Sequence, residues 1–123
     1  ERRCPPLKNL LYVIIIGRNI LMNEMNQVIH VDIDETICNT PDNPRVYEKA
    51  EPIKENIDKI NKLYDEGNTI VYWTARGSRS KIDWYDLTKS QLEQWGAKFH
   101  LLRCDKPFFD ILIDDRTMRI EEL

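Results

Sequence analysis

An alternation of apolar runs and amphipathic stretches constrains the fold of this chain more than any other feature. From about residue 26 onward, short β-branched runs typical of buried strands are separated by stretches with helical periodicity. The expected strands are Val28–Ile33, Thr69–Trp73, Phe99–Leu102 and Asp110–Ile113. This alternation predicts an α/β fold with a mostly parallel sheet, right-handed crossovers and helices on both faces.

Two helices are predicted between these strands. Pro52–Glu66 carries four apolar side chains on one face, with Pro52 in the first turn and Gly67 as the C-terminal cap. These side chains are Ile53, Ile57, Ile60 and Tyr64. Asp83–Trp95 has a second apolar stripe and stops at Gly96. The spacing therefore places one helix in each of the first two crossovers.

The size and charge of the chain limit the number of domains and the kinds of partner that are expected. Its 123 residues suit one domain, and a net charge of −3 argues against a general binder of nucleic acids or membranes. Three widely spaced cysteines form no metal-binding or disulfide pattern, which favours a reducing cytoplasm. Of these, Cys38 and Cys104 are expected near the site, as inert thiols.

Residues 1–24 are expected to be an extension of uncertain role, followed by a single domain over 25–123. The apolar run Leu10–Ile16 is too short for a membrane span, which needs about 20 residues. A secretory hydrophobic region would also be this short, but no small-residue cleavage site follows it. The alternative interpretation is that this segment forms an additional strand or helix that packs against the domain.

Polar side chains follow each of the expected strands. In parallel α/β sheets, ligands bind beyond the carboxyl ends of the strands, so these side chains should meet at one rim. They are Asp32, Asp34 and Thr36; Thr74 and Arg76; Asp105 and Lys106; and Asp114 and Asp115.

This group of residue types favours a metal-assisted phosphoryl site. Closely spaced carboxylates repel each other unless a cation or a proton lies between them. Oxygen ligands without Cys or His favour Mg²⁺ over zinc. Lys106 and Thr74 would offer positive charge and a donor to a phosphoryl group, while one carboxylate attacks phosphorus and another moves protons.

Four motifs resemble those of the haloacid-dehalogenase-like (HAD) phosphatases. VIHVDIDET (28–36) is similar to the hhhhDxDxT signature, and IVYWTAR (70–76) to the second motif. Lys106 stands where the third-motif lysine is expected, and ILIDD (111–115) resembles the fourth motif. The ending KPFFDILIDDR is more loosely similar to small bacterial phosphatases of capsule and sugar metabolism.

The resemblance implies a role for each matching residue. Asp32 would be the nucleophile and a metal ligand, and Asp34 the general acid/base, with its backbone carbonyl on Mg²⁺. Thr74 and Lys106 would hold the phosphoryl group. Asp115, or else Asp114, would complete the metal site. The candidate substrate-binding residues are Thr36, Arg76 and Arg45. For Arg76, a structural salt bridge is the alternative to a substrate contact.

The resemblance also implies an architecture. It is a Rossmann-like three-layer α/β/α sandwich with strand order about 3-2-1-4. The gaps 37–51 and 103–109 are too short for a cap domain, so the site should be open. The usual fifth strand is absent or reduced to Arg116–Glu121, and the exposed sheet edge would allow a homo-oligomer.

The expected function is hydrolysis of a small phosphorylated metabolite, such as a sugar phosphate or nucleotide. A catalytically silent HAD-like binding or scaffold protein is the alternative. A receiver-type phosphoacceptor domain is less favoured, because its accepting aspartate lies on a middle strand and has no neighbour like Asp34.

Overall fold

The computed structural model describes residues 26–42 and 44–123. The expectations for residues 1–24, including the apolar run, lie outside this part of the chain. Within it, no helix combines the length and the apolar character that crossing a bilayer requires.

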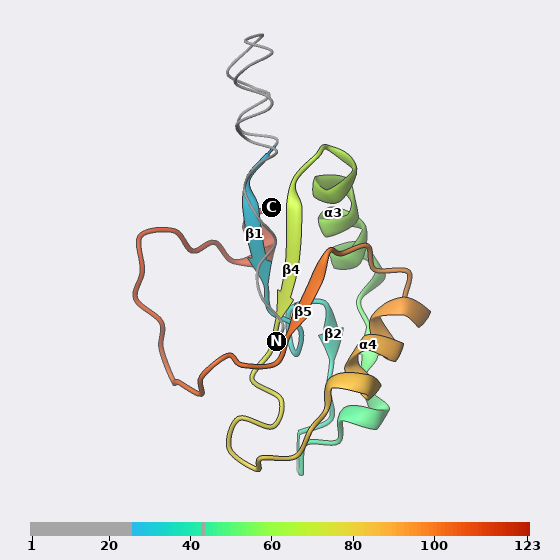
Figure 1. Ribbon diagram of the computed structural model, residues 1–123, viewed down its shortest axis with the longest axis vertical. Coiled ribbons are helices and arrows are strands. Elements are labelled where there is room, and N and C mark those ends of the chain that lie inside the picture. Colours follow the sequence, from blue (N-terminus) through green and yellow to red (C-terminus); the bar gives the residue numbers. More distant parts are fainter. Residues whose placement is uncertain (1–25, 43) are drawn as a thin grey trace, which may run out of the picture.

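The sheet has three parallel strands in the described residues: β1 (Val28–Val31), β4 (Thr69–Trp73) and β5 (Leu101–Arg103). They lie in the order β1–β4–β5, with β4 in the middle (Figure 1). This is the order predicted for the first three strands. The α/β class and the parallel pairing are therefore confirmed.

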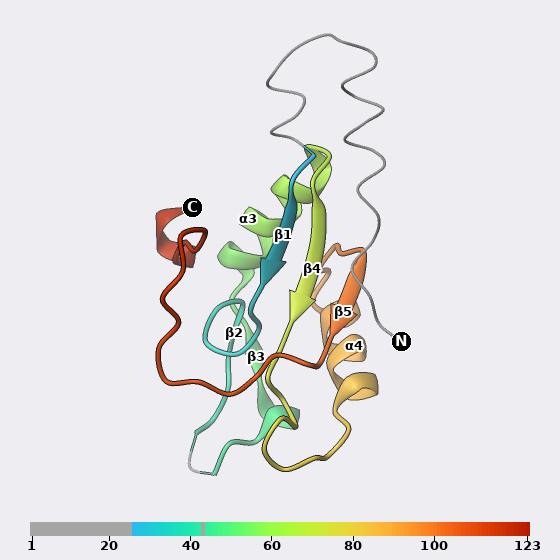
Figure 2. The ribbon, with the colours of Figure 1, turned by 60° about the vertical axis from the view of Figure 1, so that its left-hand side comes forward.

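Two α-helices connect these strands, α3 (Lys54–Asp65) and α4 (Tyr85–Gln94). Both crossovers step in the same direction across the sheet, so right-handed connections place both helices on one face (Figures 1 and 2). The expectation of helices on both faces is not met by residues 26–42 and 44–123. The three-layer arrangement is accordingly not established.

The core lies between the helices and the sheet. Ile57 and Ile60 from α3 and Leu92 from α4 are buried against alternate residues of the strands. The strand residues of this cluster are Val31, Ile70, Tyr72 and Leu102. The period of two along β4 points Ile70 and Tyr72 toward the helices.

Short elements complete the chain between β1 and α3 and at the C-terminus. β2 (Cys38–Asn39) pairs with β3 (Glu51–Pro52) in antiparallel fashion, and the 3-10 turn η1 (Tyr47–Lys49) lies between them. A second 3-10 turn, η2 (Ile120–Glu122), ends the chain. Residues 37–42 and 44–51 therefore form a small flap between β1 and α3, and these residues contain no cap domain, as expected from the length of this gap.

The predicted fourth strand is wrong for this structure: Asp110–Ile113 forms no strand. It belongs to a wide arc that leaves β5 and returns past β1 (Figure 2). Ile111 is 78% exposed and Ile113 93%. A β-branched run favours an extended chain, but a strand also needs a partner to take its backbone hydrogen bonds. No such pairing forms here.

Among the described core residues, Tyr72 carries a polar group without a hydrogen-bond partner. Its hydroxyl is buried and has no hydrogen-bond partner within residues 26–42 and 44–123. Burial also raises the pKa of the phenol. An unsatisfied buried hydroxyl costs about 1–3 kcal/mol.

We therefore expect Tyr72→Phe to leave the free energy of unfolding unchanged or to raise it by about 1 kcal/mol. Urea unfolding followed by circular dichroism measures this. Leu92→Ala is the comparison, with an expected loss of about 2–5 kcal/mol. A loss above about 1 kcal/mol in Tyr72→Phe would show that the hydroxyl is satisfied after all.

Candidate active site

The chain leaving β1 folds into a tight loop that presents two carboxylates. Thr36 and Ile37 both donate backbone hydrogen bonds to the carbonyl of Ile33, at 3.1 and 2.9 Å. Ile33 and Ile37 are fully buried and anchor the loop in the core. Asp32 and Asp34, on either side of Ile33, both line the same pocket.

The segment after β4 supplies a hydroxyl and a tight turn. The Thr74 hydroxyl accepts a hydrogen bond from the Arg76 backbone N–H at 3.1 Å, so its own proton remains to be donated to a ligand. Gly77 has a φ of +84°, and a Cβ there would lie 2.1 Å from the carbonyl oxygen of Ile82. Only glycine fits this turn, which sets the path of residues 77–82 along the pocket.

Lys106 joins this segment to the first loop. Its backbone N–H donates to the Thr74 carbonyl at 3.2 Å, and its ammonium lies 3.1 Å from one oxygen of Asp32. The Thr36 hydroxyl donates to the other oxygen of Asp32 at 3.1 Å. Asp32 is thus held by a cation and a hydroxyl. Two segments that are distant in the sequence meet at this carboxylate, and the backbone of Lys106 connects them to the segment after β4.

These residues surround a pocket of about 510 Å³. Its walls are formed by segments 74–80 and 106–109, together with Asp32, Asp34, Arg45 and Tyr47. Four cationic side chains and two carboxylates line it, and one of these cations, Arg45, is also paired with two acids outside the lining, Glu35 and Asp42, at 3.4 and 3.3 Å. The lining groups are Arg45, Arg76, Arg79 and Lys106, against Asp32 and Asp34. This balance favours an anionic ligand.

Arg76 is buried below this pocket and pairs with Asp34. Its Nε and Nη2 donate to the two oxygens of Asp34 at 2.9 and 2.8 Å, and its side chain is 0% exposed. Its Nη1 donates to Thr88 and Gln91 of α4, at 3.1 and 2.7 Å. The Tyr47 ring lies 4.7 Å from its guanidinium carbon. Sequence reasoning left Arg76 open between a substrate contact and a structural salt bridge, and the structure shows the salt bridge.

This pairing controls the charge of Asp34. Burial by itself would raise the pKa of the carboxyl, but the hydrogen bonds and charge of Arg76, with Thr40 and Arg45, outweigh it and lower the pKa. Asp34 is therefore ionised at neutral pH. The carboxylate is held as an ion-pair partner, whereas the acid/base role implied by the resemblance needs an exchangeable proton.

Cys38 lies beside this pair as a neutral thiol. Burial raises the pKa of the thiol to about 11, and its sulfur lies 3.7 Å from an oxygen of Asp34. A thiol with this pKa is protonated at neutral pH and is a poor nucleophile. The expectation of an inert thiol at Cys38 agrees with this setting.

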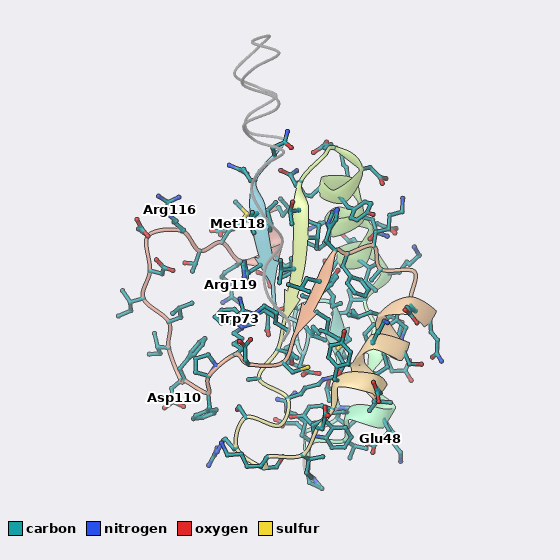
Figure 3. All side chains as sticks on the ribbon, viewed as in Figure 1. Glu48, Trp73, Asp110, Arg116, Met118 and Arg119 are labelled. Carbon is teal, nitrogen blue, oxygen red and sulfur yellow. The ribbon has the colours of Figure 1, made fainter. Side chains whose placement is uncertain are left out.

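The structure does not bring Asp114 and Asp115 to the site. Both are exposed and lie on the arc, outside the pocket lining. Figure 3 shows the flanking Asp110 and Arg116 on this arc, away from the sheet. The predicted convergence of four strand ends is therefore met by three of them, because the fourth segment does not pair with β1.

The fit to Mg²⁺ is incomplete for the same reason. Among the described residues, no group of three or more acidic, histidine or cysteine side chains is placed to hold a metal ion. Asp32 offers carboxylate oxygens, but both oxygens of Asp34 accept bonds from Arg76. Of the two carboxylates in this pocket, Asp32 is therefore the one that could offer oxygens to a cation in this arrangement.

Sequence reasoning missed several residues that build the pocket. Thr88 and Gln91 support Arg76 from α4, and their polar side chains within an apolar stripe were the available signal. Phe108 and Phe109 line the pocket directly after Lys106. Two adjacent phenylalanines in a segment with no helical or strand pattern were a signal for an exposed aromatic site.

Comparison with protein-family models gives no match, and comparison with curated proteins gives no match either. Among solved structures, the chain is similar to the crystal structure of a target protein from Vibrio cholerae. The two share 24% sequence identity with a TM-score of 0.68, over 79% of this chain and 85% of the other. At this identity the similarity supports the fold alone.

We expect Arg76→Met to lower the free energy of unfolding by about 3 kcal/mol at pH 7, because it leaves a largely buried carboxylate unpaired. In the native protein the pKa of Asp34 is lowered, so its stabilisation is present above the ordinary pKa of 3.8 and is lost as the pH falls through the lowered value. The deficit of the variant should therefore shrink below about pH 4.

Urea unfolding from pH 3 to pH 8 tests this. Lys98→Met is the control, since it breaks an exposed ion pair with Asp65 and should cost under about 1 kcal/mol. Equal losses in the two variants would contradict a structural role for the buried pair.

Proposed function

We propose that this protein hydrolyses phosphomonoesters through an aspartyl-phosphate formed on Asp32. The observation that carries the proposal is the meeting of Asp32, Thr74 and Lys106 in one pocket that is lined by four cationic side chains. A carboxylate nucleophile, a hydroxyl donor and an ammonium are the groups that phosphoryl transfer to a protein acid needs. The resemblance of four segments to the HAD motifs supports the same reaction.

In the first step, an oxygen of Asp32 attacks phosphorus. A bond forms between this oxygen and phosphorus, and the bond from phosphorus to the ester oxygen breaks. Lys106 and the Thr74 hydroxyl would hold the phosphoryl oxygens while charge redistributes over them. The hydrogen bond from Thr36 keeps the other carboxylate oxygen in place. The leaving oxygen takes up one proton, which the protonated form of Asp34 would have to supply; Asp34 is then left as a carboxylate that takes a proton from water in the second step.

In the second step, water attacks the phosphorus of the aspartyl-phosphate. The bond to Asp32 breaks, inorganic phosphate leaves and the carboxylate is restored. The resemblance gives both proton transfers to Asp34. In that role one oxygen of Asp34 would have to exchange its bond with Arg76 for a bond to the leaving group or to water. The bond between Lys106 and Asp32 does not involve Arg76, so nucleophile and phosphate site would remain assembled.

The active form of the sheet would include the fourth strand. In the described residues β1 is an edge strand, and the arc that carries Asp110–Ile113 is tied down on both sides. Lys106 fixes one end, and the carbonyl of Ile120 accepts a bond from Lys59 at the other. Pairing of Asp110–Ile113 with β1 would give the order 3-2-1-4. It would carry Asp114 and Asp115 toward Asp32, and Mg²⁺ binding would depend on it.

A second candidate function is reversible binding of a phosphorylated ligand without turnover. The bidentate pair between Arg76 and Asp34 favours it, because that carboxylate is not offered to a ligand. The two functions differ in one product: only the hydrolase forms a covalent phosphoryl group on Asp32.

We expect Asp32→Asn to lower kcat/KM by at least about 10³-fold, because an amide oxygen is a poor nucleophile. Phosphate release is measured with and without Mg²⁺ on sugar phosphates, nucleotides and aryl phosphates. Intact-protein mass spectrometry after rapid acid quenching should detect one added phosphoryl group in the native protein only. Asp58→Asn, which replaces an exposed acid of α3 that pairs with Lys54 and does not line the pocket, should keep full activity. Ligand binding without phosphate release or a phosphoprotein would favour the second candidate.

We expect the double variant Asp114→Asn, Asp115→Asn to lose the Mg²⁺ dependence of phosphate release, with kcat reduced by about 10²-fold or more. Activity is titrated with Mg²⁺ after treatment with a chelator. Glu121→Gln, an exposed acid of η2, should titrate like the native protein. If the double variant kept the native Mg²⁺ dependence, the arc would have no part in the metal site.

A further inference from the structure

The segment directly after Lys106 gives the pocket an aromatic wall. Pro107, Phe108 and Phe109 all line it, opposite the segment 74–80. Phe108 is 54% exposed and Phe109 36%. Apolar ring surface therefore faces water within a pocket that is otherwise charged. Covering such surface with an apolar ligand group contributes about 25 cal/mol per Å².

Each ring of this wall lies next to a cation. The guanidinium carbon of Arg79 is 4.6 Å from the centre of the Phe108 ring. The ammonium of Lys106 is 5.4 Å from the centre of the Phe109 ring and 5.6 Å from that of Trp73. Arg79 forms no ion pair with an acid in residues 26–42 and 44–123. The rings are thus held by cation–π contacts and not by packing into the core.

Lys106 also sets the distance from the rings to the reacting group. Its ammonium is 3.1 Å from Asp32 and 5.4 Å from the centre of Phe109. Lys106 therefore lies between Asp32 and the aromatic wall. A phosphoryl group on Asp32 would lie close enough to the wall for a small ester group to reach it. The part of the ligand that meets the wall is the alcohol side of the ester.

The two phenylalanines differ from the other exposed apolar residues of the same segment. Ile111, Leu112 and Ile113 are exposed but do not line the pocket. The aromatic side chains are confined to the part of the arc that Lys106 fixes at the site. The aromatic character therefore belongs to the pocket and not to the arc as a whole.

We infer that the pocket selects phosphomonoesters whose alcohol carries an aromatic ring, with Phe108 and Phe109 as the surface on which that ring stacks. This inference rests on the proposed function and names its substrate class. A planar aromatic ring can stack on the phenylalanine rings and can also be attracted by the neighbouring cations. An alkyl chain gains only the free energy of burying apolar surface.

Non-hydrolysable phosphonates separate this selectivity from turnover. Isothermal titration calorimetry of the whole chain would compare benzylphosphonate, cyclohexylmethylphosphonate and butylphosphonate. We expect benzylphosphonate to bind about 5- to 10-fold more tightly than the other two, as one stacking contact of about 1 kcal/mol or more implies. Cyclohexylmethylphosphonate has nearly the same size and apolar area, so it isolates the contribution of the ring.

Two conservative variants identify the stacking surface. Phe108→Leu and Phe109→Leu keep the apolar bulk and remove the ring, so one or both should reduce the preference for benzylphosphonate to within about 2-fold. Ile111→Leu is the matched control on the same segment and should keep the native preference. Butylphosphonate binding should stay within about 2-fold in all three variants.

Equal binding of the three phosphonates by the native protein would overturn the inference, as would no binding or a preference that survives both leucine variants. Failure of the proposed function has a different signature. In that case neither benzyl phosphate nor butyl phosphate would release phosphate, while the difference between the phosphonates would remain.

Discussion

The buried ion pair between Arg76 and Asp34 is the interaction on which the site depends. It ties the loop after β1 to the segment after β4, and through Thr88 and Gln91 it ties both to α4. Gln91 in turn donates to the carbonyl of Tyr47 at 2.7 Å, so the flap is held by the same network. A buried pair of this kind adds little net stability compared with an apolar contact. Its effect is to specify one arrangement of four segments.

That arrangement leaves Asp32 as the carboxylate that is open to a ligand. Asp34, two residues later, is directed inward to Arg76, while Asp32 meets Lys106 and Thr36 at the pocket wall. The two acids of one short motif thus have different environments and different tasks. In this structure Asp34 organises the protein through its pair with Arg76, and it would have to leave that pair to transfer protons, whereas Asp32 already faces the pocket.

The sequence predicted the elements whose signals are local. Strand Thr69–Trp73 is found with the expected bounds, and α3 and α4 begin and end within two residues of the expected positions. Gly67, with a φ of +102°, follows the end of α3 as predicted, because a positive φ favours glycine at that position. Pro52 was expected in the first turn of this helix, but it lies in β3, two residues before Lys54. Asp110–Ile113 has an equally clear local signal. Its pairing depends on the distant edge of β1, which local preference does not determine.

The candidate site was also predicted only where the position of a residue along the chain is sufficient to place it. Strand order places Asp32, Thr74 and Lys106 at one rim, so knowledge of the topology was sufficient to bring them together. The partner of Arg76 was not accessible in this way. An arginine at a strand end can turn outward to a ligand or inward to Asp34. In this protein the choice depends on two polar side chains of α4, Thr88 and Gln91. Nothing in the sequence identifies these two residues as partners of Arg76.

The bare flank of β1 also affects how the molecules behave toward each other. Within the described residues β1 pairs with a strand on one side only, and the apolar run Ile111–Ile113 of the same chain is exposed. If that run from one molecule occupied the flank of another, two chains would exchange equivalent segments and each would complete its neighbour's sheet. The backbone groups of β1 could then pair either with the segment of their own chain or with that of a second chain. A higher protein concentration would favour the exchanged dimer.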